Sequence, residues 1–139
     1  MNVSELPFNK LIGLELAPKD SDFQTSLPEN TQYTNHLGTV HASAMLAVAE
    51  AASGAFLAKQ FSSYSGFVPV VRRLEAKFRK PAVGQISARC VFTPEILDIW
   101  KGELTSRGRL SIAIPVEVVD TAGIIVMSAT VEWFISSAA

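Results

Sequence analysis

The sequence is poor in cysteine and has no excess of charge of either sign. Cys90 is its only cysteine, which excludes an internal disulfide and fits a reducing compartment such as the cytoplasm. The net charge is −1 over 139 residues, so no overall field would draw the protein to nucleic acid or to an anionic membrane. We therefore expect a cytoplasmic protein with neither of these as a partner.

Several common signatures are also missing. The first residues contain no basic segment followed by an apolar run, so no signal peptide is expected. The chain has no Gly-x-Ser-x-Gly elbow and no phosphate-binding loop. His36 and His41 have no third metal ligand in the local pattern, so we expect neither a metal site nor a redox cofactor. Cys90 alternates with Ile86 and Ala88, which is typical of a core position.

What the chain does have is apolar content. Hydrophobic residues make up 48% and charged residues 18%, as in an ordinary globular protein. A chain of this length suffices for one sizeable core. We found no repeat, no low-complexity run and no linker, so a single domain over residues 1–139 is expected.

The most unusual stretch is Thr39–Gln60, where eight residues are alanine and only Glu50 and Lys59 are charged. A surface helix would carry a full polar face. This stretch therefore predicts a long helix that the rest of the protein covers on most sides. Its polar residues, such as His41 and Ser53, argue against a membrane span.

The remaining segments alternate between apolar and polar residues. We predict two further helices, a short one at Val3–Ile12 and one from Pro94 to Arg107, with Thr93 as N-cap and Gly108 as its stop. We predict a strand or bent pair of strands at Leu14–Leu27 and strands at Gly66–Lys80 and Gln85–Phe92. Leu110–Val119 and Ile124–Ile135 should form a β-hairpin around the turn Asp120–Gly123. Strands segregated from one long helix indicate an α+β fold, a curved antiparallel β-sheet wrapped around one long central α-helix.

Four residues in and before the central helix could form a site. We expect His41 in the first helical turn, where backbone N–H groups, including that of Ala42, are free to bind an oxygen that gains negative charge. Gly38 would let the chain approach closely, and Asn35 could donate a hydrogen bond to water or substrate. Glu50 lies nine residues beyond His41, roughly 13 Å along the helix and on its opposite face. If both serve one site, Glu50 must come from a second copy with an antiparallel helix.

The pattern Asn35-x-x-Gly38-x-x-His41, with an acid nine residues later in an alanine-rich helix, resembles the hotdog-fold acyl-CoA thioesterases of the phenylacetate-pathway type. The similarity covers roughly Leu14 to Ile135. It implies hydrolysis of an acyl-CoA or acyl-carrier thioester, with coenzyme A present only as part of the substrate. The Ala42 N–H would polarise the thioester carbonyl, Asn35 and His41 would position substrate or water, and Glu50 of the partner protomer would activate water or attack directly.

The same resemblance implies a homodimer with two antiparallel helices, in which Gly66–Lys80 pairs across the dimer. Two such dimers could pair again as a dimer of dimers. The acyl group would lie between protomers, and CoA phosphates would meet a basic run. The expected acyl contacts are Met45, Leu46, Val70, Val71 and Leu74, and the expected phosphate contacts are Arg72, Arg73 and Lys77.

Other interpretations remain open. Glu50 could be a buried acid satisfied locally, His41 a local cap, and the basic run a solvated strand face. The family usually follows its histidine with two glycines, where this chain has Ala42-Ser43. That difference favours an alternative function, a catalytically weak module that binds acyl-CoA or an acyl carrier. A dehydratase or hydratase on the same fold has neither the expected loop nor the expected spacing.

Overall fold

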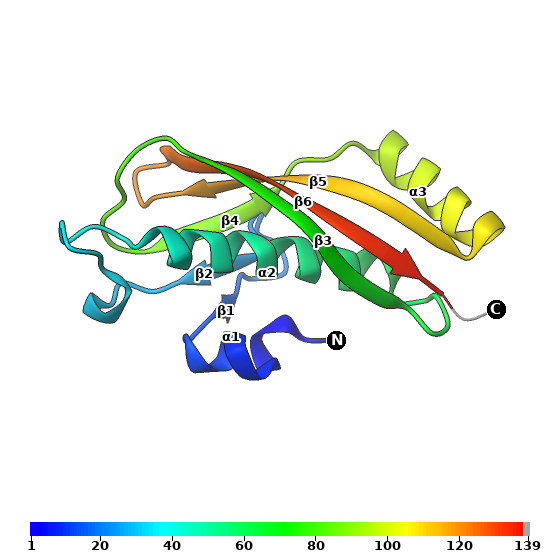
Figure 1. Ribbon diagram of the computed structural model, residues 1–139, viewed down its shortest axis with the longest axis horizontal. Coiled ribbons are helices and arrows are strands. Elements are labelled where there is room, and N and C mark those ends of the chain that lie inside the picture. Colours follow the sequence, from blue (N-terminus) through cyan, green and yellow to red (C-terminus); the bar gives the residue numbers. More distant parts are fainter. Residues whose placement is uncertain (138–139) are drawn as a thin grey trace.

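The computed structural model describes residues 1–137 as one curved sheet around a central helix (Figure 1). Residues 138–139, which the expected domain includes, lie outside the described residues. In chain order the elements are η1 (Val3–Glu5), α1 (Pro7–Leu11), β1 (Glu15–Leu16), β2 (Thr25–Leu27), η2 (Thr31–Tyr33), α2 (Ala42–Phe61), β3 (Val68–Phe78), β4 (Ile86–Cys90), α3 (Pro94–Arg107), β5 (Arg109–Val119) and β6 (Ile125–Ser136).

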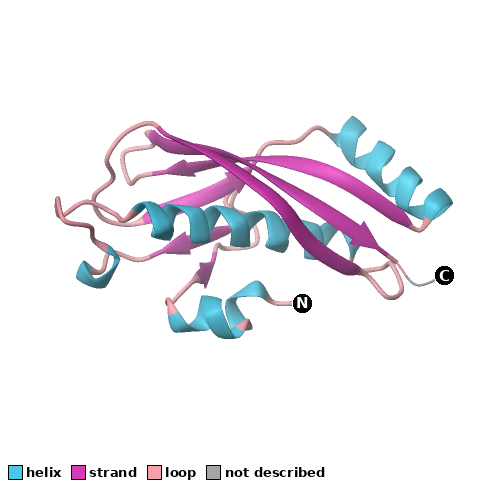
Figure 2. Ribbon diagram, in the orientation of Figure 1, coloured by secondary structure: helices cyan, strands magenta, loops and turns pink. Residues whose placement is uncertain are grey.

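The six strands form one antiparallel sheet in the order β1-β2-β4-β5-β6-β3. The sheet curves over α2, as Figure 2 shows. This confirms the expected α+β fold. The segment before the helix is a bent pair, because β1 pairs back on β2 before β2 joins β4.

Helix α2 is covered unevenly along its length. Toward its end, Phe56, Leu57 and Phe61 are almost fully buried. Burying side chains of this size stabilises a fold by about 1.5–3 kcal/mol each. Toward its start, one side is open. The residues of this open stripe are Ser43, Leu46, Ala47 and Glu50, which are exposed or half-buried. The expectation of a helix covered on most sides therefore holds best for its second half.

The β-hairpin predicted from the alternating sequence is confirmed as β5 and β6. Alternate residues of β5, from Leu110 to Val118, are buried, and β6 buries Val131, Trp133 and Ile135. The Asp120 carboxylate accepts the N–H groups of Ala122 and Ile124, each at 2.9 Å, and closes the turn. Strand β6 also pairs with β3. Within residues 1–137, the other edge of β3 pairs with no strand.

Helix α3 begins and ends where its sequence predicts. The Thr93 hydroxyl accepts the Ile96 N–H at 3.2 Å, and Gly108 has the left-handed φ of 69°. The Tyr64 hydroxyl donates to the Lys101 carbonyl at 3.0 Å and so joins α3 to the end of α2. No helix in the described part of the chain is long and apolar enough to cross a membrane.

The N-terminal segment lies along the side of α2 away from β4 and β5 (Figure 1). Its predicted helix is split into η1 and α1, because Pro7 begins a new helix. The Asn9 amide donates to the Val3 carbonyl at 3.0 Å, and the Tyr33 hydroxyl donates to the Ile12 carbonyl. The first bond holds η1 and α1 together, and the second joins the end of the segment to η2.

Candidate active site

The loop before α2 is organised by the side chain of Asn35. Its carbonyl oxygen accepts the N–H groups of Leu37 at 2.9 Å and Thr39 at 3.1 Å. Its amide nitrogen donates to the Thr39 hydroxyl at 2.9 Å. Both ends of the side chain thus hold the loop together. One amide hydrogen remains for water or substrate, the role expected from the sequence.

Gly38 serves the turn through its backbone conformation. Its φ of 75° lies in the left-handed region that favours glycine. A Cβ atom added here would meet nothing within 4 Å among the described atoms. The glycine is therefore explained by the turn and not by a close approach of two chain segments.

His41 is the N-cap of α2 and lies one residue before the first helical residue, not within the first turn. Its Nδ1 accepts the Ser43 N–H at 2.9 Å. A neutral imidazole that accepts at Nδ1 carries its hydrogen on Nε2. Because the side chain is exposed, His41 offers this Nε2–H to a ligand at the helix end.

The N–H group of Ala42 is the free donor of this helix end. The Ser43 N–H is capped by His41, and the N–H groups of Ala44 and Met45 both approach the His41 carbonyl, at 3.0 and 3.2 Å. In residues 1–137 the Ala42 N–H has no protein acceptor. A free N–H at a helix N-terminus favours an oxygen that carries negative charge.

Two pockets flank this helix end. One, of about 300 Å³, lies between it and the end of β3, and its wall includes Asn35, Ala42, Arg79 and Lys80. The other, of about 180 Å³, lies between α1 and α2, and its wall includes His41 and Ser43. Ala42 thus lines the first pocket, and its chain neighbours His41 and Ser43 line the second.

Glu50 lies on the open stripe of the same helix. Desolvation by burial raises the pKa of its carboxyl group above the ordinary value. Among the described residues its carboxylate makes no hydrogen bond or ion pair, and only its backbone carbonyl is engaged, by Ser53. Glu50 follows His41 by nine residues, about 13 Å along the axis, and no contact joins the two side chains in one protomer.

The expected acyl contacts are divided between the two faces of the sheet. Leu74 pairs with Val131 and Val71 with Trp133, so both lie on the face toward α2. Val70 pairs with Phe134 and lies on the outer face, half exposed. Of the two residues on the helix, Met45 is buried and Leu46 lies on the open stripe.

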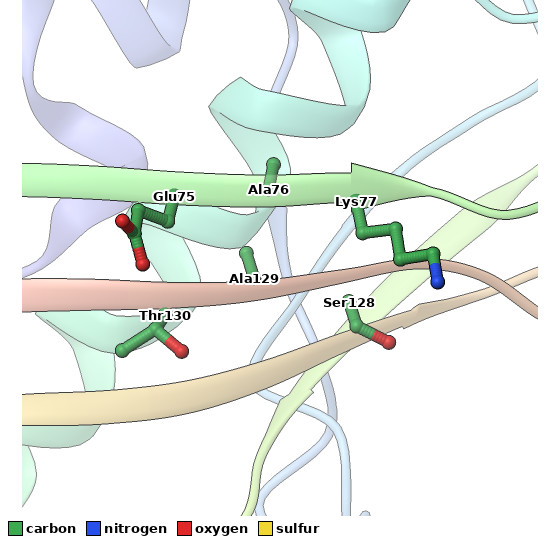
Figure 3. Close-up of a pocket in the computed structure, with 6 residues that line it drawn as sticks. All are labelled: Glu75, Ala76, Lys77, Ser128, Ala129 and Thr130. Carbon is green, nitrogen blue, oxygen red and sulfur yellow. The ribbon is translucent and has the colours of Figure 1, made fainter.

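The expected phosphate contacts lie on the outer face of β3. Arg72 stacks over Phe134 at 5.9 Å from the ring centre, and Arg73 forms an ion pair with Glu75. Lys77 borders a shallow groove between β3 and β6, whose polar side chains point to one side of the sheet (Figure 3). Arg79 and Lys80, the next two cations along the chain after Lys77, border the 300 Å³ pocket at the helix end.

The described residues contain no group of three or more His, Cys, Asp or Glu side chains that could hold a metal ion. The site therefore consists of a free N–H, an imidazole, an amide and, on the same helix, a carboxyl group with a raised pKa. These groups are suited to polarise a carbonyl and to accept a proton from water.

Comparison with solved structures shows the fold. A Pseudomonas aeruginosa protein described as a "probable thioesterase" is similar with a TM-score of 0.81 and 23% identity, over 98% of this chain and 91% of that one. A mutant of a Staphylococcus aureus thioesterase has a TM-score of 0.68 and 11% identity, over 94% and 99% of the two chains. A Bacillus halodurans protein, whose structure was solved with CoA, has a TM-score of 0.68 and 20% identity, over 92% and 74%.

Sequence comparison identifies the family. No curated protein sequence matches the chain. The profile of a family described as "Domain of unknown function (DUF4442)" matches residues 10–135. This match spans most of the sheet and all of α2. The chain has the hotdog fold of these thioesterase-like structures and belongs to the DUF4442 family.

Proposed function

We propose that this protein hydrolyses acyl thioesters, with an acyl-CoA or a similar carrier thioester as substrate. The observation that carries the proposal is the Ala42 N–H, which has no acceptor in the described chain. Ala42 lines one pocket, and its neighbours His41 and Ser43 line another. A thioester carbonyl bound there would be polarised as its carbon is attacked. Similar folds described as thioesterases, and one solved with CoA, support this choice.

Glu50 of a partner protomer would serve as the base. Its carboxylate takes a proton from water while the water oxygen bonds to the carbonyl carbon. The negative charge on the carbonyl oxygen is stabilised by the Ala42 N–H and by the His41 Nε2–H. When the C–S bond breaks, the leaving sulfur takes the proton from Glu50, and an acid and a thiol are released. Direct attack by Glu50 would use the same geometry.

The free edge of β3 supports the shared site. An unpaired strand edge can pair with another chain. Val68 and Val70 on this strand are 52% and 50% exposed. Antiparallel pairing of two β3 strands across a two-fold axis would extend the sheet and turn the open stripes of the two α2 helices toward each other. A homodimer follows, and two such dimers could form a tetramer.

The cations nearest the helix end favour a CoA-like leaving group. Arg79 and Lys80 border the pocket that contains Ala42, and Arg79 also donates to the Ser128 hydroxyl at 2.7 Å. Arg72 and Arg73 lie instead on the outer face of the sheet, beside Phe134 and Glu75. We therefore assign phosphate contacts to Arg79 and Lys80 in preference to Arg72, Arg73 and Lys77. Guanidinium and ammonium groups both bind phosphate.

A second candidate is a module that binds acyl thioesters without turning them over. Ala42 and Ser43 place a methyl and a hydroxymethyl group at an exposed helix end, where glycines would leave it open. These side chains could hold the thioester carbonyl too far from the free N–H. The two functions share the pockets and differ in turnover.

Thiol release measured over a panel of acyl-CoAs separates these functions. We expect turnover by the wild type and a loss of about 10²- to 10⁴-fold for Glu50→Ala, the range for removal of a general base. Glu132→Ala is the matched control, because Glu132 is half-buried on β6, on the face away from α2. Turnover unchanged by Glu50→Ala would contradict the mechanism. Binding without turnover on any thioester would favour the module.

A further inference from the structure

The surface of the pocket between α1 and α2 is mostly apolar, and Gln32 and Tyr33 are polar residues of its wall. Phe8 and Ile12 come from the N-terminal segment, Leu27 from β2, and Ala44 and Ala47 from the helix. The Tyr33 hydroxyl beside it is already bonded to the Ile12 carbonyl. The pocket wall therefore offers apolar surface to a ligand and few free hydrogen-bonding groups.

This pocket opens at the helix end that holds the candidate site. His41 and Ser43, the N-cap and second residue of α2, form part of its wall. The other pocket at this helix end contains Ala42 with the cations Arg79 and Lys80. A molecule held by its carbonyl at the Ala42 N–H would thus meet an apolar pocket on one side and a cationic one on the other. An acyl-CoA has the matching polarity, with an apolar tail and a phosphorylated carrier.

The apolar pocket is formed before any ligand binds. Its outer wall is fixed by the bonds from Tyr33 to Ile12 and from Asn9 to Val3. Val3 in turn packs against Gly54 of α2, where a Cβ atom added to the glycine would lie 3.6 Å from the Val3 side chain. A preformed pocket spares a ligand the cost of ordering the wall.

The pocket is open on one side, and its volume indicates the size of the group that it can cover. Its volume is about 180 Å³, and an apolar cavity of about 150 Å³ in another protein stays dry and binds benzene. Resting on the proposed thioesterase function, we propose that this pocket is the acyl subsite and accepts a short chain of about six carbons or a single ring. Ala44 and Ala47 set the depth of the pocket, because a larger side chain at either position would project into it. This placement replaces the expected acyl contacts along β3.

Binding of non-hydrolysable S-alkyl-CoA thioethers, measured by calorimetry, tests the subsite without turnover. For the wild type we expect affinity to rise by roughly fourfold per buried methylene up to about six carbons, and then to level off. Ala47→Leu should remove most of this gain for S-hexyl-CoA and leave the affinity for CoA itself unchanged. Ala55→Leu is the matched control, because Ala55 is a half-buried alanine of α2 that lines a different pocket, with Leu16 and Phe23.

The outcomes separate the subsite from the catalytic proposal. A length-dependent gain that persists in folded Ala47→Leu, or a wild type that gains nothing from the alkyl chain, would overturn the subsite. The gain together with its loss in Ala47→Leu, but without thiol release from any acyl-CoA, would support the subsite and contradict hydrolysis. Where hydrolysis does occur, Ala47→Leu should shift the preferred acyl chain to a shorter one.

Discussion

Glu50 lies half-buried on the open stripe, among alanines, without a charged or hydrogen-bonding partner for its carboxylate in the described chain. Burial raises its pKa above the ordinary value of 4.5, because the charged form is poorly solvated. The same property that suits a general base near neutral pH costs stability. This link between activity and stability can be measured in one substitution.

We predict that Glu50→Gln stabilises the protein at neutral pH. The folded state binds the Glu50 proton more tightly than the unfolded chain, so the wild type has its full stability from this group below about pH 4.5 and loses it as pH rises through the raised pKa. The difference in Tm between Glu50→Gln and wild type should therefore grow with pH. Thermal melts from pH 4 to 8 would measure it, and a difference independent of pH would show that the carboxylate is well solvated.

At the scale of elements, the sequence predicted the strongly periodic parts well. The β5–β6 hairpin followed from strict alternation, and α3 followed from Thr93 and Gly108 at its ends. For β1 and β2 the sequence does not distinguish one strand from a bent pair, because their pairing depends on contacts that periodicity does not encode. The buried helix α2 was recognised because it lacks a polar face.

Two details of the site could not be predicted from pattern. Val71 and Leu74 are three residues apart and would face opposite ways in a regular strand. They share a face because the register shifts between Val71 and Arg73, a β-bulge that adds one residue to the strand. For His41, the sequence leaves a local cap open as one interpretation but cannot decide for it, because Ser, Thr, Asp and Asn are the usual caps. The geometry decides it, since Nδ1 accepts the Ser43 N–H.

Because His41 is an N-cap, we predict that its role in stability can be separated from its proposed role in catalysis. His41→Ala should lower the free energy of unfolding by about 1 kcal/mol, whereas His41→Asn should retain most of it, since asparagine is a good N-cap. Both should lose turnover, by about 10²- to 10³-fold if the Nε2–H stabilises the developing oxyanion. Chemical denaturation and thiol release measure the two effects. A fully active His41→Asn variant would leave His41 as a cap alone.

At the scale of the whole molecule, the arrangement of α2 links function to assembly. Its N-terminus carries the free Ala42 N–H, and Glu50 lies eight residues further, about 12 Å along the axis, where it cannot reach that N–H in the same protomer. The free edge of β3 offers a way to bring a second copy alongside. Under the proposed mechanism, each site therefore draws residues from two chains.

A mixed dimer tests this requirement most directly. Chains carrying His41→Asn and Glu50→Ala would be given different affinity tags, co-expressed and purified through both tags, with thiol release as the readout. Each variant alone should be nearly inactive. The heterodimer combines an intact His41 from one chain with an intact Glu50 from the other, so one of its two sites is restored and about half of wild-type activity is expected. Heterodimers that form but are no more active than either homodimer would contradict the shared site.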